Sequence, residues 1–267
     1  MKVRTIAFNT FGTFLHNKVI VVLCLLFVCC FLLGLYSVLT FKSMTTASNA
    51  QQMQSLMLDD LGKTLFLLSG LGSLLAAWVA AAAVADETKS GTILAVMARP
   101  LRRWQFLTGK YLGVLMLMSI YALGMVGVIF LLTWLGGQPF RTPWWILFAY
   151  PLARYAIWAA ISMFLVTLLN PAVVMGIVAV LLSLIRVLGA PSVLTEIPGW
   201  VRLPMHTVLP LTSVVLGEDR FLTMTQAALK RYPWTDHVTA LAYGVDYALV
   251  WFLLALAVFH YRSLSRD

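Results

Sequence analysis

The sequence predicts an all-α integral membrane protein with six transmembrane helices in a single domain. Its 267 residues are 61% hydrophobic and only 11% charged, with a mean hydropathy of +0.90. Soluble domains carry about 25% charged residues, so this chain has too little polar surface to cover itself in water. Apolar runs of roughly 20 residues, enough to cross the hydrocarbon of a bilayer as helices, recur along it. No segment shows the alternation of a membrane β-barrel.

Residues 1–18 predict an amphipathic helix ahead of the first span. Apolar side chains from Val3 to Leu15 recur with helical spacing, and basic residues stand at both ends. A helix of this kind can lie along the inner leaflet of the membrane. The alternative is a cytosolic extension of the first span, and periodicity alone does not separate the two.

The six spans are expected at 19–41, 65–85, 111–135, 144–169, 171–189 and 238–260. The second span repeats small residues every fourth position, from Ser69 to Ala81, which lets neighbouring helices approach closely. It should therefore be central, with packing inside one protomer favoured over a dimerisation role.

Two features make the fourth span and the turn after it distinctive. The fourth span contains Pro151, so an interfacial stretch followed by a shorter span is the alternative for 144–169. It is followed at once by Asn170-Pro171, a pair that ends one helix and opens the next. The fourth and fifth spans should therefore be adjacent and antiparallel.

The longest segment between spans is 190–236, which contains five prolines and one apolar stretch too short to cross a membrane. It is either a surface loop or a set of short helices that re-enter the outer leaflet. Non-helical backbone at membrane depth needs protein or a water-filled cavity around it.

The basic residues indicate the orientation of the chain. With both termini in the cytoplasm, segments 1–18, 86–110 and 261–267 hold ten Lys and Arg residues, whereas the longer outer segments hold seven. This bias follows the positive-inside rule. The net charge of +9 is therefore a topology signal, and its dispersal among loops argues against nucleic-acid binding.

Residues 86–110 are the one long charged stretch between two spans on the cytoplasmic side. A helix is expected over 85–98, entered through Asp86 and Glu87 and ended before Pro100. Arg103 and Lys110 should then lie near the lipid headgroups. Composition alone predicts an ordinary charged loop, but the stretch also carries a pattern made by Glu87, Gly91, Thr92, Arg99, Pro100, Arg103, Gly109 and Lys110.

The order and spacing of these residues resemble the segment between the second and third spans of ABC-2 type permeases, the membrane subunits of one class of ATP-binding-cassette transporters. The likeness extends to the entry sequence IAFNTF…NK, the six spans and the long outer segment. It implies an interfacial entry helix, re-entrant outer helices and a coupling segment at 86–110.

The resemblance also implies partners and a location. The permease would work with two copies of a separate ATPase, which would bind ATP and Mg, and with a second protomer, identical or homologous. It would be an exporter in the bacterial cytoplasmic membrane, with both termini inside. An anchoring or maturation-complex subunit without transport is the alternative, and an intramembrane enzyme is a weaker one.

The chain lacks the motifs of a catalyst. A P-loop would need glycine at Trp104 and Ser or Thr at Tyr111, so ATP hydrolysis is expected from a partner and no cofactor is expected here. The four histidines have no metal-ligand spacing. A copper site made by the methionines of 42–64 is conceivable but not favoured, and no metal is expected.

Three charged residues fall within or near the ends of spans. Arg154 and Asp246 lie at similar depths in the fourth and sixth spans, and Arg186 lies near the outer end of the fifth. Intramembrane charges are expensive and normally face the bundle interior, a partner or a water-filled cavity. They are candidates for substrate contact, although a structural ion pair or interfacial snorkelling is favoured.

Overall fold

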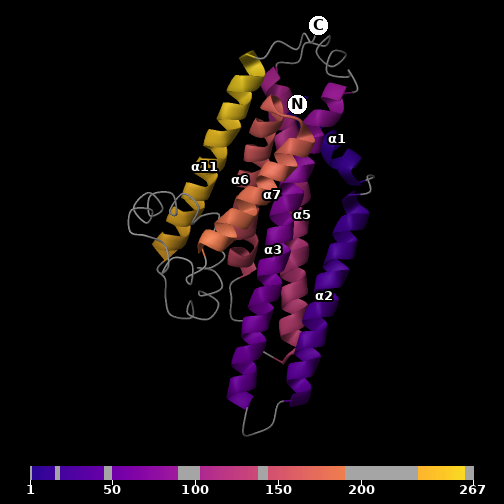
Figure 1. The fold of residues 1–267 in the computed structure, drawn as a ribbon, viewed down its shortest axis with the longest axis vertical. Coiled ribbons are helices and arrows are strands. Elements are labelled where there is room, and N and C mark those ends of the chain that lie inside the picture. Colours follow the sequence, from indigo (N-terminus) through magenta and orange to yellow (C-terminus); the bar gives the residue numbers. More distant parts are fainter. Residues whose placement is uncertain are drawn as a thin grey trace.

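In a computed structural model, the chain forms a helical bundle over the residues that the structure describes: 2–15, 19–44, 50–89, 103–137, 144–189 and 234–261 (Figure 1). The helices are α1 (Lys2–Leu15), α2 (Val19–Met44), α3 (Ala50–Lys89), α5 (Arg103–Leu135), α6 (Trp144–Leu168), α7 (Pro171–Gly189) and α11 (Trp234–Tyr261). No strand occurs within these ranges, which confirms the all-α class. Most of the predicted outer segment, 190–233, lies outside them.

Five of the described helices are long and apolar enough to cross a membrane. The qualifying stretches are Cys24–Met44, Gln54–Ala85, Trp104–Leu135, Leu147–Leu168 and Leu241–His260. In α7 the apolar stretch is the shorter Pro171–Ser183, below the roughly 20 residues of a full crossing. The chain is thus a multi-pass helical membrane protein, and the sixth span stays a prediction.

The helices run alternately up and down the bundle (Figure 1). One end, which we call the α1 end, holds α1, the last turns of α3 and α11, and the first turns of α5. Both ends of segment 86–110 therefore reach the same end of the molecule.

The helix α3 is much longer than predicted. It has 40 residues, so it extends for about 60 Å, twice the thickness of the hydrocarbon core. The spans expected at 19–41 and 65–85 left 42–64 as an outer loop between them. That prediction is wrong over most of the segment, because α2 continues to Met44 and α3 begins at Ala50.

Side-chain packing explains this extension. Met57 and Leu61, four residues apart on α3, are buried against Val38 of α2 and Leu132 of α5. The three helices form a small apolar core at the end of the bundle opposite α1 (Figure 1). Helix α5 ends there, just before Gly137, which has a φ of +68°. The first turns of α3 are amphipathic and contain no continuous apolar run, so the sequence did not predict them as part of the span.

As predicted, the span rich in small residues is central. Its fully buried small side chains are Ser69, Ser73, Ala76, Ala77 and Ala80. They let α5 and α6 approach closely enough to donate hydrogen bonds to the α3 backbone, from Tyr121 Oη to Leu68 O (2.7 Å) and from Ser162 Oγ to Ala77 O (2.6 Å). The small-residue stripe therefore serves packing within the protomer.

The helix α6 is continuous through Pro151, so the alternative of an interfacial stretch plus a shorter span is wrong. Neighbouring helices allow proline inside such spans. The helix ends in the predicted tight turn, where Asn170 O accepts the first hydrogen bond of α7, from Val174 N (3.0 Å). From this turn α7 runs back obliquely across the bundle (Figure 1).

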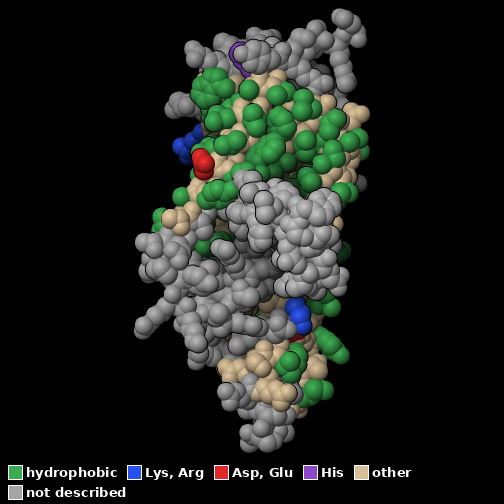
Figure 2. All heavy atoms as spheres, turned by 60° about the vertical axis from the view of Figure 1, so that its left-hand side comes forward, with side chains coloured by type: hydrophobic (Ala, Val, Ile, Leu, Met, Phe, Trp, Pro, Cys, Tyr) green, Lys and Arg blue, Asp and Glu red, His purple; other side chains and the backbone are tan. Residues whose placement is uncertain are grey.

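The helix α11 packs mainly on α6 and leaves its other side exposed. Figure 2 shows hydrophobic side chains spread over the upper part of this face of the molecule. The exposed apolar side chains of α11 include Val245, Leu249, Val250, Leu253 and Leu254. An apolar surface of this extent suits contact with lipid rather than water.

Candidate functional site

The structure describes half of the predicted coupling residues. Glu87 lies in the last turns of α3, Arg103 is the first residue of α5, and Gly109 and Lys110 lie two turns further along α5. The other four lie outside the described residues: Gly91, Thr92, Arg99 and Pro100.

The predicted start of a separate coupling helix at Asp86 and Glu87 is wrong. Helix α3 continues without a break through both acids to Lys89. The preceding sequence, AAWVAAAAVA over 76–85, is rich in alanine, the strongest helix former, and contains no glycine, proline or capping residue that would end the helix. The first four residues of the charged segment, 86–89, are therefore a direct extension of the central helix.

The first turns of α5 contact α1 on one side through two glycines. A Cβ atom on Gly109 would lie 2.7 Å from Cβ of Ile6, and one on Gly113 would lie 2.8 Å from the carbonyl oxygen of Ala7. Real Cβ atoms do not approach other atoms this closely, so only glycine permits this packing. Ala7 and Thr10 are buried in the contact.

This contact changes the interpretation of α1. Its apolar residues Ala7 and Phe14 pack into the bundle, while Phe8 is half exposed with the Arg4 guanidinium 5.5 Å from its ring centroid. The helix is docked on α5, which neither prediction for residues 1–18 foresaw. Its position along the inner leaflet stays a prediction.

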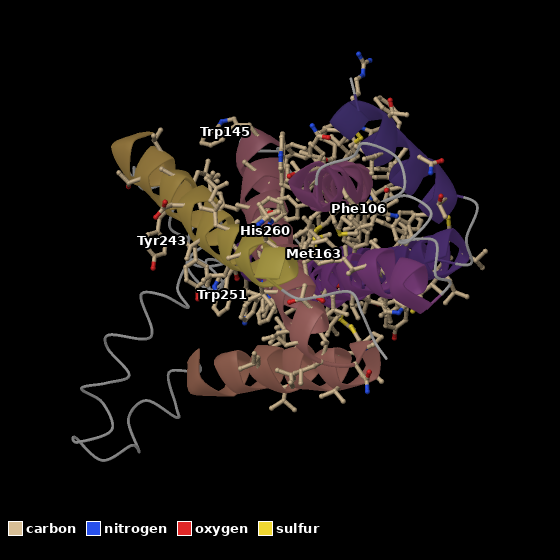
Figure 3. The ribbon with its side chains drawn as sticks, turned by 90° about the horizontal axis from the view of Figure 1, so that it is seen from above. Phe106, Trp145, Met163, Tyr243, Trp251 and His260 are labelled. Carbon is tan, nitrogen blue, oxygen red and sulfur yellow. The ribbon has the colours of Figure 1, made fainter. Side chains whose placement is uncertain are left out.

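On its other side, the start of α5 contacts α11 and α6 through aromatic residues. Phe106 stacks on Phe259 with ring centroids 6.2 Å apart, and Tyr111 stacks on Phe252 at 4.6 Å. Tyr111 Oη also donates a hydrogen bond to Ala156 O of α6 (3.0 Å). Figure 3 looks along the bundle from this end and labels Phe106 and, on α11, His260.

The Lys110 side chain does not point outward from the bundle, although a position near the lipid headgroups was predicted. It is only 9% exposed, and its Nζ lies 5.7 Å from the ring centroid of Phe106, a cation–π arrangement. Trp104, about one and a half turns earlier, is in contrast 48% exposed. The start of α5 is thus a junction where α1, α6 and α11 converge on the last residues of the charged segment.

The intramembrane charges are placed differently from one another. Arg154 is buried on α6, whereas Asp246 is exposed on the side of α11 away from Ala248 and Phe252, which pack into the bundle. The two side chains therefore do not form the ion pair that their similar depth suggested. Arg186 lies in the last turns of α7, and its side chain is outside the described part of the chain.

Because Arg154 and Asp246 do not meet, their substitutions should act independently. We expect the changes in unfolding free energy of Arg154→Leu and Asp246→Leu to add in the double variant within about 0.5 kcal/mol. The measurement is the unfolding of the purified single and double variants in the same detergent. Recovery of stability in the double variant would show that the two charges are coupled after all.

No group of three His, Cys, Asp or Glu residues in the described part of the chain is arranged to hold a metal ion. Of the methionines considered for copper, Met57 is buried in the apolar core with Val38 and Leu132, and Met44 is exposed at the end of α2. These positions are those of packing and surface residues.

Sequence reasoning missed most of the junction. It singled out Gly109 and Lys110 but not Gly113, Tyr111 or the α11 partner Phe252. One signal was present, since Gly109 and Gly113 form the small-x-x-x-small pattern of close helix contacts in membranes. The aromatic partners on α11 are about 140 residues away in the chain and left no local signal.

Comparison with known proteins adds one finding. A family model described as "ABC-2 family transporter protein" matches residues 4–264, nearly the whole chain. No curated protein gives a significant match.

Proposed function

Because this chain belongs to the ABC-2 family of transporter proteins, we propose that it is the permease subunit of an ATP-binding-cassette transporter driven by a separate ATPase. The observation that carries the proposal is the junction at the start of α5. Segment 86–110 connects the central helix α3 to this junction, so a partner that moves the segment would act on α1, α3, α6 and α11 together.

The packing around the start of α5 supports the idea that a displacement of its first turns is passed on to the neighbouring helices and is not absorbed by side-chain rotation. The Gly109 and Gly113 contacts with α1 involve backbone atoms, which cannot rotate away as side chains do. The stacked rings of Tyr111 and Phe252 are buried. Close-packed interiors transmit strain, so displacement of the first turns of α5 should reach the helices around it.

We further propose an assembly of two such permease protomers, identical or homologous, with two ATPase copies that bind ATP and Mg. We propose export across a bacterial cytoplasmic membrane, the direction and location that the resemblance to ABC-2 permeases implies. The basic bias of 1–18, 86–110 and 261–267 supports a topology with both termini of the chain in the cytoplasm. Glu87, Gly91, Thr92, Arg99, Pro100, Arg103, Gly109 and Lys110 are the proposed coupling residues.

The test targets the segment itself. Glu87→Ala and Gly91→Trp should abolish stimulation of the ATPase or its co-purification, because they change the proposed docking surface. Membrane insertion should be normal. Gly127→Trp is the matched control, since Gly127 lies on the exposed side of α5 with no atom within 4 Å of its Cβ position.

Two results would count against this proposal. Normal ATPase stimulation and co-purification in both variants would remove the coupling role from 86–110. Stable co-purification of the wild-type chain with membrane proteins, but with no ATPase among them, would favour the alternative of an anchoring or maturation-complex subunit.

A further inference from the structure

The exposed side of α11 carries a carboxylate, that of Asp246, within a stretch long enough to cross a membrane. The stretch is Leu241–His260, and Asp246 lies in its second turn. Ala248 and Phe252 pack into the bundle, and a residue two positions before Ala248 points to nearly the opposite side of a helix. The Asp246 side chain is accordingly exposed and directed away from the bundle.

A carboxylate in this position calls for a counter-charge. The exposed side chains near it on α11 are apolar, among them Val245, Leu249 and Val250. Within the described part of the chain, no hydrogen bond or ion pair joins Asp246 to another residue. Charged side chains at membrane depth are costly and normally have an ionic partner. Because Asp246 points outward, we expect its partner to be a cation that reaches α11 from outside the bundle.

Aromatic rings lead from Asp246 back to the bundle. Tyr243 lies three residues earlier and is therefore its neighbour on the helix surface, and the carboxylate is close enough to act electrostatically on the Tyr243 hydroxyl. The rings of Tyr243 and Tyr247 are stacked with centroids 6.3 Å apart, and Tyr247 meets Trp251 edge-on, also at 6.3 Å. Trp251 in turn lies 5.4 Å from Phe164 of α6. Figure 3 labels Tyr243 and Trp251 on α11.

This row of rings is suited to a cation as well as to packing. Tyr243, Tyr247 and Trp251 are all half-buried, so part of each ring is accessible. The faces of tyrosine and tryptophan rings attract cations, and quaternary ammonium groups are recognised in this way. A carboxylate beside such rings adds a full negative charge to the same surface.

The depth of these groups indicates what carries the cation. Asp246 and Tyr243 lie near the first residue of the membrane-length stretch, whereas the exposed side chains of Leu253 and Leu254 lie two turns further into it. The surface is thus charged and aromatic near one end of the span and apolar towards its middle. An amphiphile whose headgroup is cationic has the same order of groups along its length.

We propose that Asp246, Tyr243 and Tyr247 form a site on the outer surface of α11 for the ammonium headgroup of a cationic amphiphile in the bilayer, with its hydrocarbon tail along Leu253 and Leu254. The site goes beyond the proposed function, because it requires neither an ATPase nor transport. It lies in the leaflet farther from the α1 end, since α11 runs from that leaflet towards α1.

The first experiment tests the charge and the tail with matched lipids. The full chain is purified in dodecyl maltoside, and lipid adducts are counted by native mass spectrometry during a titration. The probe is dioleoyl trimethylammonium propane, with dioleoylglycerol as the uncharged lipid of equal chain length and dioleoyl phosphatidylglycerol as the anionic one. The first adduct of the cationic lipid should form with an affinity on the order of tenfold higher than that of either control, because an ion pair is strengthened in surroundings of low dielectric constant.

The second experiment assigns the preference to its residues. Asp246→Asn keeps the size of the side chain and should remove most of the tenfold preference. Asp60→Asn, which changes the net charge equally but lies on α3, is the matched control and should bind like the wild type. Tyr243→Leu should weaken binding of the cationic lipid about threefold, the effect of one cation–π contact, whereas Tyr243→Phe keeps the ring and should not.

Three results would overturn the site. They are equal affinity for the cationic and the uncharged lipid, wild-type binding by Asp246→Asn, and a loss in Asp60→Asn as large as that in Asp246→Asn, which would show attraction to net charge alone. A chain that is a dimer in detergent, dissociates on Asp246→Asn and shows no preference for the cationic lipid would assign this surface to a second protomer instead. Because the measurement uses the chain without an ATPase, its outcome is independent of the test of the coupling segment.

Discussion

Replacing Gly113 by leucine should force α1 away from α5 and lower the free energy of unfolding by about 2–3 kcal/mol, the upper part of the range for overpacked cores. The new side chain would begin at a Cβ position 2.8 Å from both Ala7 O and Thr10 Cβ. The backbone oxygen cannot yield unless α1 moves. Thermal unfolding of the purified variant measures the effect.

Gly127→Leu is the control for this prediction, because Gly127 lies on the same helix with no atom within 4 Å of its Cβ position. Leucine favours the helix over glycine by several tenths of a kcal/mol or more, so this variant should be as stable as the wild type or more so. Equal stability of Gly113→Leu and Gly127→Leu would mean that α1 does not depend on this contact.

The same variant tests the part that α1 plays in the junction. If α1 moves with the first turns of α5, Gly113→Leu should lower ATPase stimulation even at temperatures where the protein stays folded. A truncation of residues 2–15 should have the same effect. Normal stimulation in both variants would restrict α1 to a stabilising role.

Gly72→Leu should be more damaging, with a loss of about 3 kcal/mol or more in unfolding free energy, because overpacking here meets rigid partners. A Cβ atom on Gly72 would lie 2.5 Å from Tyr155 Oη and 2.6 Å from Tyr121 Cε1. Both tyrosines are buried and held by hydrogen bonds, Tyr121 to Leu68 O (2.7 Å) and Tyr155 to Met125 Sδ (3.9 Å). Neither ring can turn aside without breaking its contact.

The measurement is the yield and thermal midpoint of the folded variant, with Gly176→Leu as control. Gly176 lies within α7, where nothing is within 4 Å of its Cβ position. A Gly72→Leu protein with the midpoint of Gly176→Leu would show that α3, α5 and α6 are packed less tightly than the structure indicates.

These two glycines differ in what the sequence could reveal. Gly72 stands in the small-residue region of a predicted span, and its central position was correctly expected. Gly113 belongs to a four-residue spacing with Gly109 that predicts a close helix contact without identifying the partner. That partner is α1, more than 90 residues earlier in the chain.

The largest error concerned the length of α3, which was expected to begin at residue 65 and begins at Ala50. A search for continuous apolar runs ends where polar residues begin, as at Lys63 and Asp60. The helix continues because Met57 and Leu61 bury a narrow apolar stripe against α2 and α5. Most of the stability of a helix in a protein comes from the packing of its apolar face, and a search for continuous apolar runs does not detect such a face.

The sequence by itself determined the class of the protein, five of its spans, the turn at Asn170-Pro171 and the membership in a transporter family. These depend on composition and on local patterns, since the bilayer requires apolar helices of a certain length wherever the neighbours lie. Only the tertiary structure decided which face of each helix is buried. It placed Arg154 inside the bundle and Asp246 outside, although both lie in spans at similar depth, because lipid and protein interior are almost equally apolar and the rotation of a helix depends on packing with partners distant in the chain.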